Sequence, residues 1–194
     1  MNNSIQKYLF LVVLGGRADK ANVELHDVRW VIGSCIEDTY DELRRDWFGT
    51  LKGLHIDSYK KINCVDGHKI NLRKIENKKF KNSKFFNGQN TKKNLWFVNI
   101  GGYSSRSMQE KHEFGLVVAS NSLEAKNKAK LKWLNGLKKK HKDDITSLEN
   151  FSLTDDYEPI KKIGDWEIEL TPCESFIEEN NYPDWFGYQK IDIK

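Results

Sequence analysis

The stretch YLFLVVLGG at residues 8–16 occurs a second time within the chain, as NLWFVNIGG at residues 94–102. Both copies are apolar runs that are too short for a helix and rich in Val, Leu, Phe and Trp, which predicts a buried strand in each. A removable signal peptide has no reason to recur inside a chain, so the first copy is interpreted as a strand too. The repetition predicts a duplicated fold.

The duplication extends well beyond these strands. Residues 9–57 align with residues 95–143 without a gap and share thirteen identities, where chance composition would give about three. The register resumes after a 12-residue insertion, residues 151–162, which we expect to be a longer loop. The identical first-copy residues are Leu9, Val12, Gly15, Gly16, Glu24, His26, Val31, Ser34, Trp47, Leu51, Lys52, His55 and Asp57.

Each copy is expected to have the order ββαββ. In the first copy the strands are expected at 9–14, 28–33, 54–62 and 68–73, and in the second at 95–100, 114–119, 143–151 and 163–171. Asp66-Gly67 is typical of a tight hairpin turn. Each helix is expected to start after a capping serine, Ser34 or Ser120, and the first carries the apolar stripe Ile36, Tyr40, Leu43 and Trp47.

The predicted fold class is therefore α+β, with two tandem ββαββ repeats related by pseudo-twofold symmetry. The predicted organisation is a first repeat at 1–73, a basic connector at 74–94, a second repeat at 95–172 and a C-terminal extension at 173–194. In that extension DWFG (184–187) repeats residues 46–49 outside the register, and the pattern gives this echo no structural role.

Charge is distributed unevenly along the chain. Residues 74–142 carry 17 Lys and Arg against 4 Asp and Glu, whereas residues 143–194 carry 4 against 14. A basic segment followed by an acidic one can bind a polyanion, or the two can screen each other. The Lys-rich segment 74–142 makes weak, nonspecific nucleic-acid binding one alternative function, although no aromatic RNA-reading motif accompanies it.

The cysteine pattern and the hydropathy of the chain predict where in the cell the protein is located. Cys35, Cys64 and Cys173 are odd in number, widely spaced and form no CxxC, which indicates a reducing compartment rather than a disulfide framework or a thiolate zinc site. No apolar run approaches the length that spans a bilayer, so no membrane partner is expected and a cytoplasmic location is predicted.

Polar residues retained in both copies are the candidate ligand-binding residues. Glu-x-His precedes the second strand of each copy and His-x-Asp opens the third, and a spacing of two places both side chains on one face of an extended chain. The candidates are Glu24, His26, His55, Asp57, Glu110, His112, His141 and Asp143.

Three interpretations of these candidates stay open. The groups could bind a small molecule or perform acid–base chemistry, they could hold a divalent metal, or they could be buried histidines fixed by carboxylates. No zinc signature is present, so no metal site is assigned, and the pattern names no cofactor. Gly15-Gly16 is interpreted as a turn that needs positive φ or a close backbone approach, rather than as a phosphate loop.

Residues 14–59, LGGRADKANVELHDVRWVIGSCIEDTYDELRRDWFGTLKGLHIDSY, resemble a bacterial family, domain of unknown function 1543, whose members carry one or two copies of the unit. LWFVNIGGY and HEFGLVVA resemble its second repeat, and the resemblance covers about residues 8–172. It implies a bacterial, cytoplasmic protein and implies no activity.

The function expected from the sequence is a non-enzymatic binding or interaction module with a site between its two repeats. Its partner would be a small anionic ligand or a protein. The alternative is a small-molecule enzyme that uses the His/carboxylate clusters for acid–base catalysis, and the sequence does not decide between them.

Overall fold

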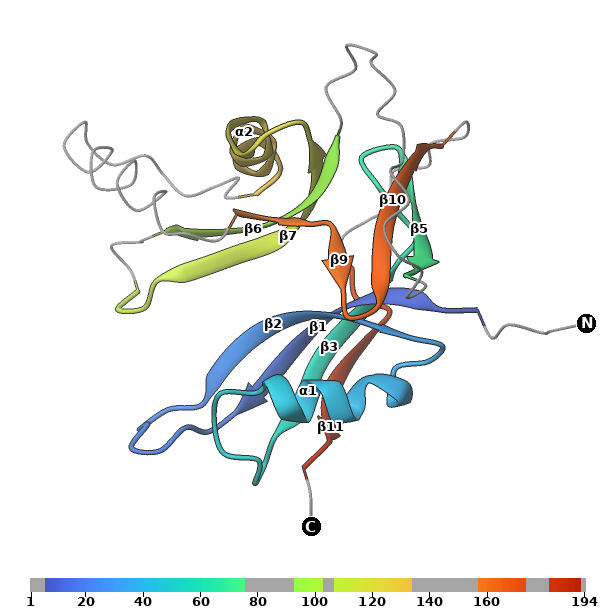
Figure 1. The fold of residues 1–194 in the computed structure, drawn as a ribbon. Coiled ribbons are helices and arrows are strands. Elements are labelled where there is room, and N and C mark those ends of the chain that lie inside the picture. Colours follow the sequence, from blue (N-terminus) through green and yellow to red (C-terminus); the bar gives the residue numbers. More distant parts are fainter. Residues whose placement is uncertain (1–5, 76–92, 103–106, 134–156, 174–181, 193–194) are drawn as a thin grey trace, which may run out of the picture. The chain divides into compact units, whose positions relative to one another are not determined.

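The computed structural model describes residues 6–75, 93–102, 107–133, 157–173 and 182–192 (Figure 1). It is mostly β-sheet with two short helices, which is an α+β class of fold. The chain divides into a first unit, Met1–Lys74 with Ile163–Lys194, and a second unit, Ile75–Lys162. No helix in the described ranges is both long and apolar enough to cross a membrane.

The first unit contains a four-stranded antiparallel sheet in the order β11-β3-β1-β2 (Figure 1). Its strands are β1 (Tyr8–Gly16), β2 (Leu25–Gly33), β3 (His55–Ile62) and β11 (Trp185–Lys190). The strand β1 therefore continues through the two glycines, where the sequence predicted a turn. Neither glycine has a positive φ, so close packing is the reason for their small size.

A short helical segment covers one face of this sheet. It consists of a 3-10 turn, η1 (Glu37–Thr39), and the helix α1 (Tyr40–Asp46). The predicted stripe is confirmed: Ile36, Leu43 and Trp47 are buried and Tyr40 packs partly buried beside them. The rest of this core is formed by Phe10, Val12, Leu14, Val31, Leu54, Ile56 and Ile191.

The C-terminal extension completes the sheet at its β3 edge. Asp184 accepts a hydrogen bond from the backbone N–H of Lys61 (2.7 Å), and Trp185 stacks on Tyr59 with ring centroids 5.9 Å apart. The DWFG segment at 184–187 thus leads into an edge strand, whereas Trp47 of the earlier DWFG ends α1. The two identical segments have different structures.

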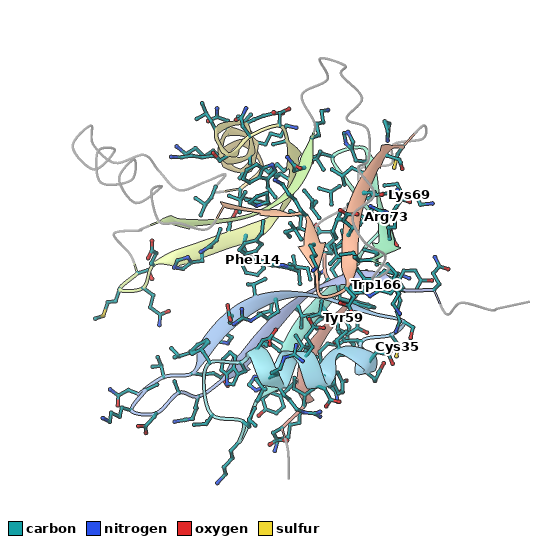
Figure 2. The ribbon with its side chains drawn as sticks, in the orientation of Figure 1. Cys35, Tyr59, Lys69, Arg73, Phe114 and Trp166 are labelled. Atoms are coloured by element: carbon teal, nitrogen blue, oxygen red, sulfur yellow. The ribbon has the colours of Figure 1, made fainter. Side chains whose placement is uncertain are left out.

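A second sheet has the order β4-β5-β10-β9. Its strands are β4 (Cys64–Val65), β5 (His68–Lys74), β9 (Lys162–Ile163) and β10 (Trp166–Pro172). Asp66 and Gly67 both have positive φ, as the predicted tight turn requires. Figure 2 shows Arg73 on β5 beside β10, where its guanidinium pairs with Glu169 (2.6 Å) and with Glu167.

The second unit holds a three-stranded sheet, β7-β6-β8, and the helix α2 (Ser122–Lys132). Its strands are β6 (Asn94–Gly102), β7 (Lys111–Ala119) and β8 (Tyr157–Ile160). The expectation of a loop at 151–162 was wrong, since β8 lies inside that insertion and pairs with β6. The strand expected at 143–151 lies outside the described residues.

The two helix starts differ from the predicted serine caps. In α2 the cap is Asn121, whose Oδ1 accepts from the Glu124 N–H (2.9 Å). Ser120 instead donates its backbone N–H to the Glu124 carboxylate (2.8 Å), and Ser34 donates in the same way to Asp38 (3.0 Å). Each serine therefore contacts an acidic side chain four residues later in the sequence, and neither serine caps its helix.

Candidate functional site

His55 is the centre of the candidate site, and its position is fixed by the fold. It is the first residue of β3 and only 1% of its surface is exposed. Its Nδ1 lies 2.8 Å from the backbone oxygen of Gly53. Because a carbonyl oxygen can only accept, Nδ1 carries the hydrogen, and Nε2 is the nitrogen that remains for other partners.

Two carboxylates face that nitrogen. The Nε2 atom of His55 lies 3.1 Å from Oδ1 of Asp57 and 3.5 Å from Oε1 of Glu24. In a neutral ring with its hydrogen on Nδ1, the Nε2 lone pair would face these negative oxygens, which is unfavourable. A proton on Nε2, or another positive group beside it, satisfies the arrangement.

Asp57 joins His55 to a second histidine. Its Oδ2 lies 3.3 Å from Nε2 of His26, while its Oδ1 contacts His55. The β1–β3 register shifts here, from Leu14 opposite Ile56 to Val13 opposite Ser58, so Asp57 is the extra residue of a bulge. Bulges commonly redirect a side chain next to a functional site.

Gly15 provides the space that these side chains occupy. It pairs with His26 on β2 and with His55 on β3, so it lies between the two histidines in one row across the sheet. Leu14 lies in the core between the sheet and α1. Successive side chains of a strand alternate between its two faces, so position 15 belongs to the opposite face of the sheet. We refer to Glu24, His26, His55 and Asp57 on this face as the His55 cluster.

The His55 cluster is covered on one side and open on the other. The ring of Tyr188 on β11 lies over His55 with centroids 4.0 Å apart. By contrast, the side chains of His26, Glu24 and Asp57 are 54%, 44% and 30% exposed. The partly exposed side chains of Glu24, His26 and Asp57 therefore lie between the buried imidazole of His55 and the solvent.

In the second unit, the described candidates are His112 and Glu110, which lie in contact with each other. His112 contacts Glu110 through Nε2 (3.4 Å) and Asn99 Oδ1 through Nδ1 (3.3 Å). The other two candidates of this copy, His141 and Asp143, lie outside the described residues. In the first copy the contacts cross between the two motifs, since Glu24 reaches His55 and His26 reaches Asp57.

The described residues bear in part on two ligands considered from the sequence, a metal ion and a nucleic acid. Among the described residues, no group of three or more His, Cys, Asp and Glu side chains could hold a metal ion. Most of the Lys-rich segment 74–142 outside β6, β7 and α2 is not described, so nucleic-acid binding through it stays a prediction. Within α2, Lys128 pairs with Glu124 (3.2 Å) and donates to the Val118 carbonyl.

Sequence reasoning missed Tyr188 and Gly53, which complete the surroundings of His55. Tyr188 lies in the C-terminal extension, outside the repeats, so a comparison of the two copies had no means of finding it. Gly53 contributes a backbone oxygen, and its φ of +80° favours glycine at this position.

Comparisons with known proteins agree with this fold. The chain belongs to the family described as Domain of Unknown Function (DUF1543), whose sequence model matches residues 21–72 and 107–153. It is similar to a solved structure titled crystal structure of a protein Il1583 from Idiomarina loihiensis, with 31% identity and a TM-score of 0.68. The similarity covers 97% of this chain and all of that one. No curated protein matches.

Proposed function

We propose that the first unit is a non-enzymatic binding module that holds a small, positively charged molecule at the His55 cluster. The observation that supports this most strongly is the contact of buried His55 Nε2 with two partly exposed carboxylates. A protonated amine can donate hydrogen bonds to both carboxylates, and such charge-assisted bonds are the stronger kind.

The charge of the cluster argues for a cation rather than the anion expected from the sequence. It contains two carboxylates and two imidazoles, so its net charge is negative unless both rings are protonated. A negatively charged cluster attracts positive ligands and repels anions. The exposed ring of Tyr188, which contacts His55, adds an aromatic face that also favours a cation.

Binding is preferred to catalysis because both nitrogens of His55 already have partners. A ring held in this way is fixed in place and positions the carboxylates. One observation supports the alternative, an acid–base enzyme: Asp57 bridges a buried and an exposed imidazole, which could pass a proton from the surface inward.

The test is calorimetric titration of the full chain with 1,4-diaminobutane and methylammonium, with inorganic phosphate as the anionic probe. Asp57→Asn should weaken amine binding about tenfold or more, since a charge-assisted hydrogen bond contributes roughly 1.5–3 kcal/mol. The matched control is Asp27→Asn, a β2 carboxylate of similar exposure (29% against 30%) that pairs with Arg29. Phosphate binding without amine binding would overturn the proposal.

The same samples distinguish a binding module from an enzyme. Proton NMR of the amine probe after prolonged incubation should show it unchanged. Conversion of the probe that disappears in His26→Ala would establish the enzymatic alternative instead.

We further propose the finer architecture expected from the sequence: two tandem ββαββ repeats related by pseudo-twofold symmetry, with the boundaries given above. The β5–β10 pairing supports it, because Asn71 pairs with Glu169, its counterpart in the repeat alignment. The resemblance to the family further suggests a bacterial cytoplasmic protein, which cell fractionation would test.

A further inference from the structure

Cys64 and Cys173 are far apart in the sequence but adjacent in the fold. Cys64 lies on β4 and Cys173 directly follows β10, and their Sγ atoms are 3.0 Å apart. The two residues are separated by 109 positions, so only the tertiary structure brings them together. The third cysteine, Cys35, is exposed and lies between β2 and η1 (Figure 2).

The backbone around the two thiols holds them at this position. The Cys173 N–H donates to the carbonyl oxygen of Gly67 in the β4–β5 turn (2.8 Å). Cys64 is opposite Lys69 on β5, and Pro172 is opposite His68 on the other side of the same strand. Both cysteines are therefore anchored to the same end of β5, one from each side.

Both cysteines are also partly exposed to solvent. Each is of intermediate burial, so a small oxidant can approach at least part of the residue. An S–S bond measures about 2.0 Å, so the sulfur atoms need to approach each other by roughly 1 Å for a bond to form.

We propose that Cys64 and Cys173 are a redox modification site that forms a reversible intramolecular disulfide. The oxidant class is a low-molecular-weight disulfide such as glutathione disulfide. This proposal is independent of the His55 cluster, because it rests on residues of a different sheet.

The exchange proceeds in two balanced steps. The thiolate of one cysteine attacks glutathione disulfide, which breaks its S–S bond, forms a mixed disulfide and releases one glutathione thiolate. The second cysteine thiolate then attacks the protein sulfur of the mixed disulfide and releases the second glutathione. The protein thiols lose two electrons and two protons, and glutathione disulfide is reduced to two molecules of glutathione.

Oxidation of the two thiols would link β4 covalently to the residue that follows β10. The closed loop contains residues 65–172 and therefore the whole second unit, Ile75–Lys162. Closing a long loop restricts the unfolded chain, so the oxidised protein should unfold at a higher temperature than the reduced protein.

The experiment uses the reduced full chain, equilibrated with glutathione buffers of increasing oxidation, alkylated and digested with trypsin. The three cysteines fall in separate tryptic peptides, 30–44, 62–69 and 163–190. We expect a cross-linked pair of peptides 62–69 and 163–190, with Cys35 alkylated. In Cys64→Ser the remaining Cys173 should instead keep a bound glutathione, and Cys35→Ser should cross-link like the natural sequence.

Two outcomes would overturn the proposal. One is equal glutathione attachment at all three cysteines with no link between the two peptides. The other is a link that forms as fast in urea-unfolded protein as in folded protein, because it would show that the fold does not bring the thiols together. Circular dichroism of each variant confirms that it is folded.

Discussion

A Cβ atom built on Gly15 would lie 2.5 Å from Nε2 of His55, closer than real side chains approach each other. It would also lie 3.0 Å from Oδ2 of Asp57. Glycine at this position is thus required by the side chains of the His55 cluster, and the strand geometry alone does not demand it.

Gly15→Ala should displace His55 and Asp57 and reduce the free energy of unfolding by about 1–3 kcal/mol, the usual cost of an overpacked site. Gly16→Ala is the matched control, since its Cβ would meet Trp47 instead, at 2.9 Å. Urea denaturation should show both variants destabilised, whereas imidazole NMR signals should shift only in Gly15→Ala. Unchanged signals in Gly15→Ala would contradict the geometry.

The two histidines of the cluster should differ in their structural importance. His55→Ala removes a buried ring and its bond to Gly53, so we expect a loss of about 2–4 kcal/mol in unfolding free energy. His26→Ala removes a half-exposed side chain and should change it by less than about 0.5 kcal/mol. Equal losses, measured in urea, would mean that His26 is structural as well.

Tyr188→Ala should expose His55 and weaken amine binding. The ring contact is of the kind that contributes about 1 kcal/mol beyond burial. Tyr188→Phe keeps the ring and serves as the control, which should bind the amine as the natural sequence does. If Tyr188→Phe loses as much affinity as Tyr188→Ala, the hydroxyl rather than the ring is the important group.

Acid should lower the free energy of unfolding, because it protonates two carboxylates at the helix starts. Hydrogen bonds from the Ser34 side chain and backbone, with Lys7 nearby, hold the pKa of Asp38 well below its ordinary value of 3.8. The Ser120 backbone N–H is the largest cause that lowers the pKa of Glu124 from 4.5. A lowered folded-state pKa stabilises the fold above the unfolded-state pKa, and this contribution disappears as pH falls through the folded-state value.

Asp38→Asn and Glu124→Gln should therefore be less stable than the natural sequence near neutral pH, and the difference should shrink as the pH falls below about 4. Thermal unfolding across that range measures it. Asp41→Asn, which alters a carboxylate with a 96% exposed side chain in α1, is the control. A difference that does not depend on pH would contradict the assigned cause.

Much of the fold could be predicted because its signals are local. The apolar run of β1, the stripe on α1 and the Asp66-Gly67 turn each follow from residues adjacent along the chain or on one helix face. The proximity of His55 and Asp57 could also be predicted, since a spacing of two places both side chains on one side of β3.

The remaining features depend on contacts between distant segments. The bulge at Asp57 is set by the pairing register of β3, and the cover over His55 comes from β11, which no repeat comparison includes. Strand β8 lies in an insertion that has no counterpart in the first copy. The meeting of Cys64 with Cys173 requires the β5–β10 pairing, which spacing along the chain does not reveal.

The most direct test of the central claim is an NMR titration that observes the imidazole nitrogens of His26 and His55 while 1,4-diaminobutane is added. We expect both sets of signals to shift and reach saturation in the natural sequence and in Asp27→Asn, and the shifts to be lost in Asp57→Asn. Signals that stay unchanged, or that move equally in Asp57→Asn, would contradict an amine site at the His55 cluster.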